Sequence, residues 1–219
     1  MNATRISFTA VASIALAGCG SPALVGMKPA AAERNEVRWS SGAPILRASG
    51  TQGTVAVSPL ADAAGRHEVG ARLPIFVLVR NASGAPREIS ETNVSVALNG
   101  AGVLVYPAAA VDRNLRESAA AAQTADAVVA AFLAWEAGGA PGAAPPPTDR
   151  AALARFHGAL GRTVIEPGGL AGGFVVADTP RELNCAEHTP TGSRSGLCTF
   201  QVLVQFAGDS HVFLLEETR

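Results

Sequence analysis

Residues 72–80 read RLPIFVLVR and form the strongest strand candidate of the chain. Side chains of an extended chain point alternately to opposite faces, so every second residue shares a face. One face of this run carries four aliphatic side chains, Leu73, Ile75, Val77 and Val79. The other face carries Phe76 and Leu78, so both faces are apolar. We therefore predict a central strand that is covered on both sides.

Weaker strand-like runs lie on either side of this one, and turn residues separate them. Residues 93–98 alternate apolar and polar, as a half-buried strand does, and Asn99-Gly100 predicts a tight turn into a partner strand over 102–106. Further candidates are residues 37–39, 54–58, 163–165, 174–176, 199–206 and 211–215. This spacing predicts a mainly β chain, folded as an antiparallel β-sandwich.

The hydrophobic periodicity changes to that of a helix between residues 112 and 137. Apolar residues recur there at helical spacings, and the many alanines favour a helix. Residues 138–147, GGAPGAAPPP, must end it, because glycines and consecutive prolines cannot continue a helix. A second helix would follow and end at Gly161, and its apolar face would carry Leu153, Phe156 and Leu160. We therefore predict an α-helical hairpin inserted in the sandwich at about residues 111–161.

The N-terminus combines one positive charge, in MNATR, with a short apolar stretch over residues 6–17 and small residues after it. This combination is typical of a secretory signal peptide. The stretch is too short to cross a hydrocarbon core as a helix, which takes about 20 residues. The sequence therefore predicts an exported protein.

Leu16-Ala17-Gly18-Cys19, at the end of this segment, resembles the lipobox of bacterial lipoproteins. The resemblance implies that the signal peptide, residues 1–18, is removed and that Cys19 carries covalent lipid, with acyl chains such as palmitate, as a membrane anchor. Because Gly20 is not aspartate, it also implies the outer membrane of a Gram-negative cell, facing the periplasm. The alternative is an ordinary signal peptide cleaved elsewhere, with Cys19 as a free thiol.

The rest of the chain divides into a tether and one domain. Residues 19–34 would be the lipidated cysteine and a flexible tether. Residues 21–34, SPALVGMKPAAAER, are mostly small, have no hydrophobic periodicity and are interrupted by prolines. A tether of this length would hold the domain roughly 20 Å from the bilayer. Residues 35–219 would form the sandwich with its helical insertion. The net charge of −1 supplies no excess of positive charge for nucleic acid, so we expect no nucleic-acid partner.

The strand pattern resembles the Ig-like and fibronectin-like domains that are common in exported bacterial lipoproteins. Its carriers are residues 73–81, 93–99, 165–168 and 172–176. The resemblance implies an Ig-like sandwich. The sequence departs from the antibody type, because its two late cysteines lie close together with no tryptophan between them. Trp39 and Trp135 are expected to be packing anchors.

Cys185 and Cys198 remain as a pair once Cys19 is lipidated, and disulfides persist in exported proteins. We predict a disulfide between them, which would stabilise the fold by about 3 kcal/mol. Two alternatives stay open. The two thiols could be free, or Cys185, His188 and Cys198 could hold copper or zinc, to which His211 could add a ligand.

No motif in the chain indicates catalysis. Residues 67–71, HEVGA, lack the second histidine of a zinc protease, and residues 192–196 have Arg194 where a nucleophilic serine would stand. We therefore expect no enzyme and no cofactor beyond the lipid on Cys19. The expected function is that of a non-enzymatic binding or assembly module of the bacterial cell envelope, with an envelope protein as partner. Its helical hairpin would be the partner surface, unless its apolar stripe packs on the sheet. The alternative function is metal handling.

Overall fold

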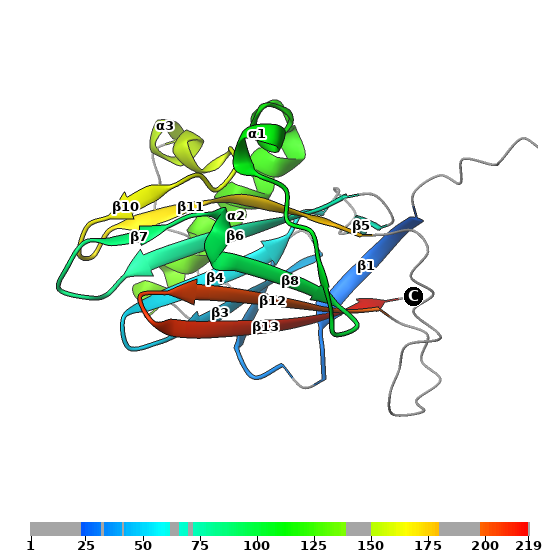
Figure 1. Ribbon diagram of the computed structural model, residues 1–219, viewed down its shortest axis with the longest axis horizontal. Helices are drawn as coiled ribbons and strands as arrows, with labels where there is room; N and C mark the ends of the chain where they lie inside the picture. The colour runs from blue at the N-terminus through cyan, green and yellow to red at the C-terminus, as the bar shows by residue number, and fades with distance from the viewer. Residues whose placement is uncertain are drawn as a thin grey trace, which may run out of the picture.

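The computed structural model describes residues 23–31, 33–40, 42–61, 66–69, 72–138, 150–179 and 198–218. Within these residues the chain is mainly β, its strands pair antiparallel, and helices cover one face of one sheet (Figure 1). The signal segment lies outside them, and so do Cys19, Cys185 and His188.

Two larger sheets face each other across a common core. The first has the strand order β5-β1-β13-β12-β8-β9 and consists of β1 (Ala23–Pro29), β5 (Arg66–Val69), β8 (Val94–Leu98), β9 (Ala101–Val103), β12 (Thr199–Phe206) and β13 (Asp209–Thr218). The second has the order β11-β6-β4-β3-β2 and consists of β2 (Glu36–Ser40), β3 (Ala43–Ser49), β4 (Gly53–Pro59), β6 (Arg72–Asn81) and β11 (Leu170–Asp178). A separate ribbon pairs β7 (Arg87–Ile89) with β10 (Thr163–Ile165).

Strand β6 lies in the interior of the second sheet, between β4 and β11. Its aliphatic face packs into the core between the two sheets and consists of Leu73, Ile75, Val77 and Val79. On its other face, Phe76 and Leu78 pack into a second core, against the helices. All six side chains are fully buried. The prediction of a central strand covered on both sides is confirmed.

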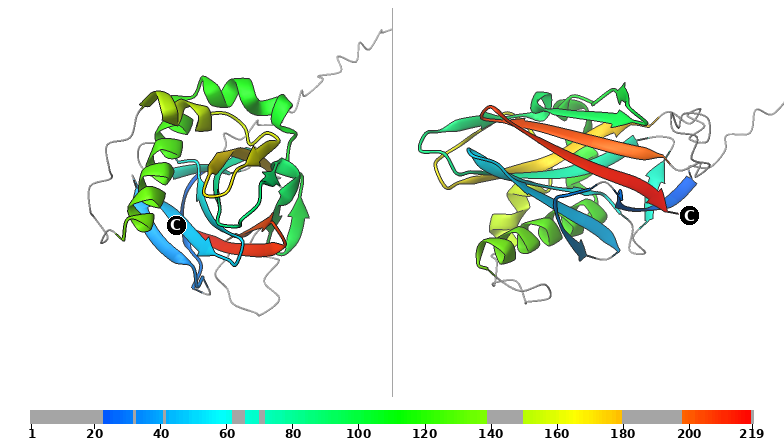
Figure 2. Two further views of the ribbon diagram at one scale, coloured as in Figure 1. Left: turned by 90° about the vertical axis from the view of Figure 1, so that its left-hand side faces the viewer. Right: turned by 90° about the horizontal axis from the view of Figure 1, so that it is seen from below.

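The helices lie between β9 and β10 in the sequence and on the outer face of the second sheet in space (Figure 2). They are α1 (Ala108–Arg116), α2 (Ala119–Glu136), α3 (Arg150–Leu153) and the 3₁₀ helix η2 (Ala154–Phe156); a further 3₁₀ helix, η1 (Glu91–Asn93), precedes β8. Within the described residues, no single helix is long and apolar enough to cross a membrane. Only α1 and α2 together meet that criterion, and they are bent by 96° at the break between them.

This break corrects the prediction of one helix over residues 112–137. Ser118 accepts a hydrogen bond from the Ala121 amide at 3.2 Å and so caps the start of a new helix. The second predicted helix is also shorter than expected, because regular helical structure ends at Phe156. Residues 158–160 instead pair with β11: the Leu160 amide donates to the Phe174 carbonyl at 2.8 Å.

Strand β1 corrects the predicted tether over residues 19–34. Ala23–Pro29 pairs with β13 on one side and with β5 on the other, so this segment belongs to the first sheet. Met27 is buried in the core between the sheets. The following residues also contact the sheet, because Glu33 accepts a hydrogen bond from the Leu214 amide. The described part of the first sheet therefore begins at Ala23.

Asn81, the last residue of β6, joins the loop that follows it to the end of β10 through a fully buried side chain. Its amide nitrogen donates to the carbonyls of Ala85 and Ile165, each at 2.8 Å. Its amide oxygen accepts from the backbone and hydroxyl of Ser83. The buried amide is thus fully hydrogen-bonded, and it holds the end of β6 against the turn that follows β10.

The outer edge of β11 is covered along most of its length. The amide of Tyr106 donates to the Val176 carbonyl at 2.9 Å, and residues 158–160 cover the stretch around Phe174. The close approach requires a glycine at position 173. A Cβ atom there would lie 2.7 Å from the Leu160 nitrogen and 2.8 Å from the Ala159 carbonyl carbon.

We expect the substitution Gly173→Ala to lower the free energy of unfolding by about 1 to 3 kcal/mol, because its methyl group meets backbone atoms that cannot rotate away. Gly102→Ala is the matched control in β9, since nothing lies within 4 Å of its Cβ position. It should change the stability by less than about 0.5 kcal/mol. Chemical denaturation of both variants measures the difference, and equal midpoints would contradict the close approach.

Candidate functional site

Of the cysteine and histidine residues proposed as a disulfide or metal set, the structure describes Cys198 and His211, and it does not bring these two together. Cys198 directly precedes β12 and is buried, and its amide donates to a Glu217 carboxylate oxygen at 3.3 Å. Cys185 and His188 lie outside the described residues, so the predicted disulfide and the alternative metal set remain predictions.

His211 does not lie near Cys198. It pairs in register with Val204, and Cys198 precedes Val204 by six positions, which is about 20 Å along a strand. No metal ion can bridge that distance, so His211 is not a fourth ligand. Among the described residues, no group of three or more histidine, cysteine or acidic side chains is arranged to hold a metal ion.

His211 instead lies in the core beside the turn between β3 and β4, with 4% of its surface exposed. Its Nε2 atom has no hydrogen-bond partner in the described part of the chain. Burial lowers the pKa of His211 below its usual value, and the nearby Asp209 carboxylate opposes that shift. Asp209 accepts hydrogen bonds from the Gln52 amide and the Thr51 hydroxyl, which lower its own pKa and join the two hairpin turns.

The predicted partner surface on the helices is largely used for packing. In α2 the side chains that face the second sheet are fully buried or nearly so: Ala121, Ala125, Val128, Val129 and Phe132. They contact Phe76 and its neighbours in the core under the helices. The apolar stripe of the helices therefore packs on the sheet and is not exposed as a partner surface.

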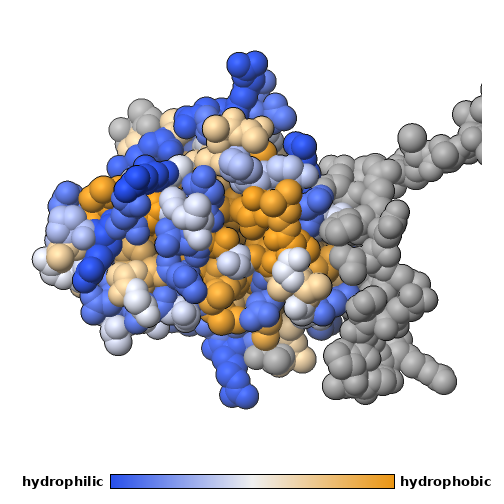
Figure 3. Space-filling model, in the orientation of Figure 1, coloured by the Kyte–Doolittle hydropathy of each residue, from blue (hydrophilic) through white to orange (hydrophobic). Residues whose placement is uncertain are grey.

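The outer face of the first sheet shows apolar side chains between polar ones (Figure 3). Val212 of β13 is 40% exposed and lies opposite the half-buried Leu203 of β12. Exposed polar residues interrupt this area, among them Ser95, Gln205 and Ser210. Exposed apolar residues interrupted by polar ones are common on protein surfaces and do not by themselves indicate a binding site.

Strand β2 forms one edge of the second sheet and, unlike the opposite edge strand β11, is not covered by other described segments. In the described part of the chain no strand pairs with the side of β2 that faces away from β3. Trp39 is 56% exposed and Val37 is 36% exposed, although both point to the same side of the sheet as the core residue Leu46. The expectation that Trp39 is a packing anchor is wrong. Tryptophan is one of the residue types enriched in interface hot spots.

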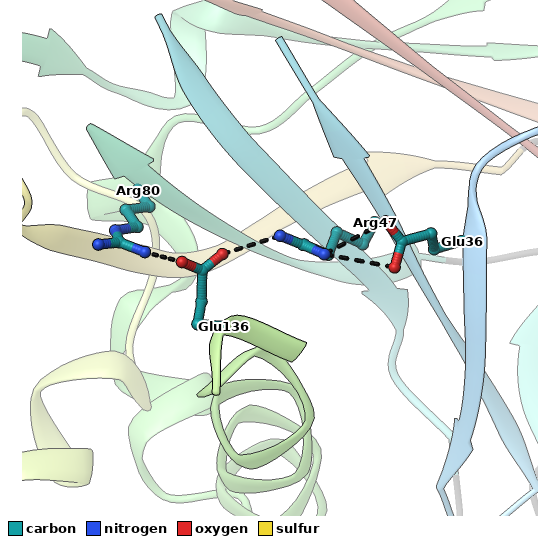
Figure 4. A network of polar contacts seen from close by, with 4 residues as sticks. All are labelled: Glu36, Arg47, Arg80 and Glu136. Atoms are coloured by element: carbon teal, nitrogen blue, oxygen red, sulfur yellow. Dashed lines mark hydrogen bonds and ion pairs between the residues drawn. The ribbon is translucent and has the colours of Figure 1, made fainter. Parts of the chain in front are cut away.

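On its other face, β2 joins a network of charged side chains at the end of α2 (Figure 4). Glu136, the last residue of α2, pairs with Arg80 of β6, and its other oxygen accepts from Arg47 Nη2 at 2.8 Å. Arg47 also reaches Glu36 of β2 at 3.2 Å. The network fixes the end of α2 to three strands of the sheet.

Aromatic rings of α2 support the same network. The guanidinium group of Arg38 lies 4.7 Å from the ring centre of Trp135, and that of Arg47 lies 5.7 Å from it. These are cation–π distances, and such contacts are strongest where the cation is partly desolvated. Trp135 is therefore a packing residue, as expected, and it contacts both the arginines and the apolar core under the helices. We take the exposed edge strand β2, with this network behind it, as the candidate binding site.

None of the protein-family models, curated proteins or solved structures compared with the chain matches it.

We expect Glu136→Gln to destabilise the protein by about 1 to 3 kcal/mol, because it weakens two charge-assisted hydrogen bonds at once and leaves Arg47 less well paired. Glu88→Gln is the control. It changes a surface pair in which the side chain of Arg162 is 79% exposed, and its effect should stay below about 1 kcal/mol. Thermal and chemical unfolding measure both effects, and equal losses would contradict a structural role of the network.

We expect the stability to depend on pH through His211. Its folded-state pKa lies below the usual 6.5 of the unfolded chain. The unfolded state therefore binds the proton more readily, so the free energy of unfolding is highest above pH 6.5 and decreases as the pH falls below it. Unfolding of wild type and His211→Gln across this range isolates the contribution. Parallel pH profiles would show that His211 plays no part.

Proposed function

We propose that this protein is a lipid-anchored, exported lipoprotein of the bacterial cell envelope that acts as a non-enzymatic binding module. The lipobox-like Leu16-Ala17-Gly18-Cys19 supports export and acylation. The observation that carries the binding role is the edge strand β2, because its outer side has no paired strand in the described residues and its Trp39 is 56% exposed. Sheet edges of this kind bind other chains by adding a strand.

The start of β1 at Ala23 changes where such a protein would lie on its membrane. Four residue steps separate Cys19 from Ala23, and a fully extended chain covers at most about 14 Å over that length. A lipidated Cys19 would thus hold the domain closer to the bilayer than the roughly 20 Å expected from a longer tether. We propose an outer-membrane lipoprotein that faces the periplasm, with its first sheet nearest to the anchor.

The finer assignment of the fold belongs to the same proposal. Two antiparallel sheets around a common core are the architecture of Ig-like domains, and the chain places its helices between β9 and β10. We propose an Ig-like sandwich in which residues 108–156 are a helical insertion. In this proposal the insertion covers the second sheet and fixes the strands behind β2, which leaves the edge itself for the partner.

We expect Cys19→Ser to abolish labelling of the protein by a radioactive or clickable fatty acid and to release it from the membrane fraction, because acyl chains supply the anchoring energy. Ala17→Ser is the control, since it changes the same segment but leaves the cysteine. Fractionation of envelope membranes and soluble periplasm measures the outcome. Unchanged membrane association of the Cys19→Ser protein would overturn the proposed anchor.

A further inference from the structure

Strand β2 reads Glu-Val-Arg-Trp-Ser, and charges of opposite sign lie on either side of Val37. Glu36 is opposite Arg47 in the register with β3, on the face that the helices cover. Arg38, two residues on, shares this face and lies over the Trp135 ring. Val37 and Trp39 therefore point to the opposite face.

We propose that β2 pairs antiparallel with β2 of a second copy of the chain, about a twofold axis through Val37. In this register Glu36 of each copy lies opposite Arg38 of the other. Side chains directly opposite each other on antiparallel strands are about 4.5 to 5.5 Å apart at Cβ, which is within ion-pair reach. Twofold symmetry forms this pair twice.

The charges select this register among those that the sheet allows. Residues on the face that the helices cover must lie opposite residues on the same face of the second copy. Only registers that meet this condition are allowed. Two allowed registers neighbour this one. The register centred on Arg38 would place two arginines opposite each other, and the register centred on Glu36 would place two glutamates opposite each other, so both are unfavourable. Glu36 remains available for the proposed pair, because its side chain is 55% exposed although it also contacts Arg47.

The opposite face of the same pairing is apolar. Val37 would lie against Val37 of the second copy at the axis, and Trp39 would lie diagonally from it at each end, within reach of an aromatic side chain. Pairing would thus cover the two most exposed apolar side chains of β2. The lipid anchor of the proposed function would add to the affinity by confining both copies to one surface.

Cross-linking tests the register directly. A short bis-maleimide should join two copies of the Val37→Cys variant of the full mature protein in detergent or in membranes. Val164→Cys, in β10, is the control, because Val164 is also a strand valine and is 60% exposed. A cross-linked dimer for the first variant alone supports the pairing. No dimer, or equal cross-linking of both variants, overturns it.

Charge exchange tests the ion pairs. Glu36→Arg and Arg38→Glu should each weaken dimerisation by about tenfold or more, because each replaces two opposite-charge pairs by two like-charge pairs. The double variant should restore dimerisation to near the wild-type level. Sedimentation velocity of the non-acylated protein measures the dissociation constants. Failure of the double variant to recover while it remains folded overturns the proposed register.

Trp39→Lys provides a variant that leaves the charged network unchanged. It should also weaken the dimer, and its thermal unfolding should match that of wild type because Trp39 is largely exposed. Unchanged dimerisation would overturn the proposed contact between Val37 and Trp39 of the two copies. A protein that is acylated and membrane-bound, yet monomeric at all concentrations, would refute the pairing and leave the proposed anchor standing.

Discussion

The burial of β6 on both faces is the constraint on which the other layers depend. Phe76 and Leu78 need a cover on one side of the second sheet, and the aliphatic residues of β6 need a cover on the other. Full burial of one such side chain contributes about 1.5 to 3 kcal/mol, so neither cover can be lost without a large cost. Helices α1 and α2 supply one cover and the first sheet supplies the other, which makes the fold a three-layer arrangement.

Sequence patterns predicted the parts of this fold that depend on neighbouring residues. The alternation over residues 72–80 indicated both faces of β6, and Asn99-Gly100 indicated the turn between β8 and β9, where both residues have positive φ. Strand β1 was missed because its sheet partner β13 lies at the other end of the chain, and ALVGMKP has little periodicity of its own. The break at Ser118 was missed because alanine dominates the helical signal on both sides of it.

The candidate site could not be assembled from the sequence for a similar reason. Its charged residues come from β2, β3, β6 and the end of α2, and only the paired register brings Glu36 and Arg47 together. One sequence signal does point to the site: Arg47 follows Ile45 on the same face of β3, and a charge on a face that is otherwise apolar needs a buried or half-buried partner. The exposure of Trp39 depends on how far the first sheet extends, which no local pattern encodes.

One edge of the second sheet is covered and the other is open in the described residues, and this difference bears on function. The β11 edge is covered by residues 104–106 and 158–160, at the cost of a glycine at position 173, whereas β2 has no such cover in the described residues. Short length and charged residues normally protect an open edge against unspecific pairing. In β2 the two charges have opposite signs around Val37, so they disfavour most foreign strands and most registers but not the twofold-related copy of the same strand. An edge that excludes most strands in this way remains selective for its own sequence.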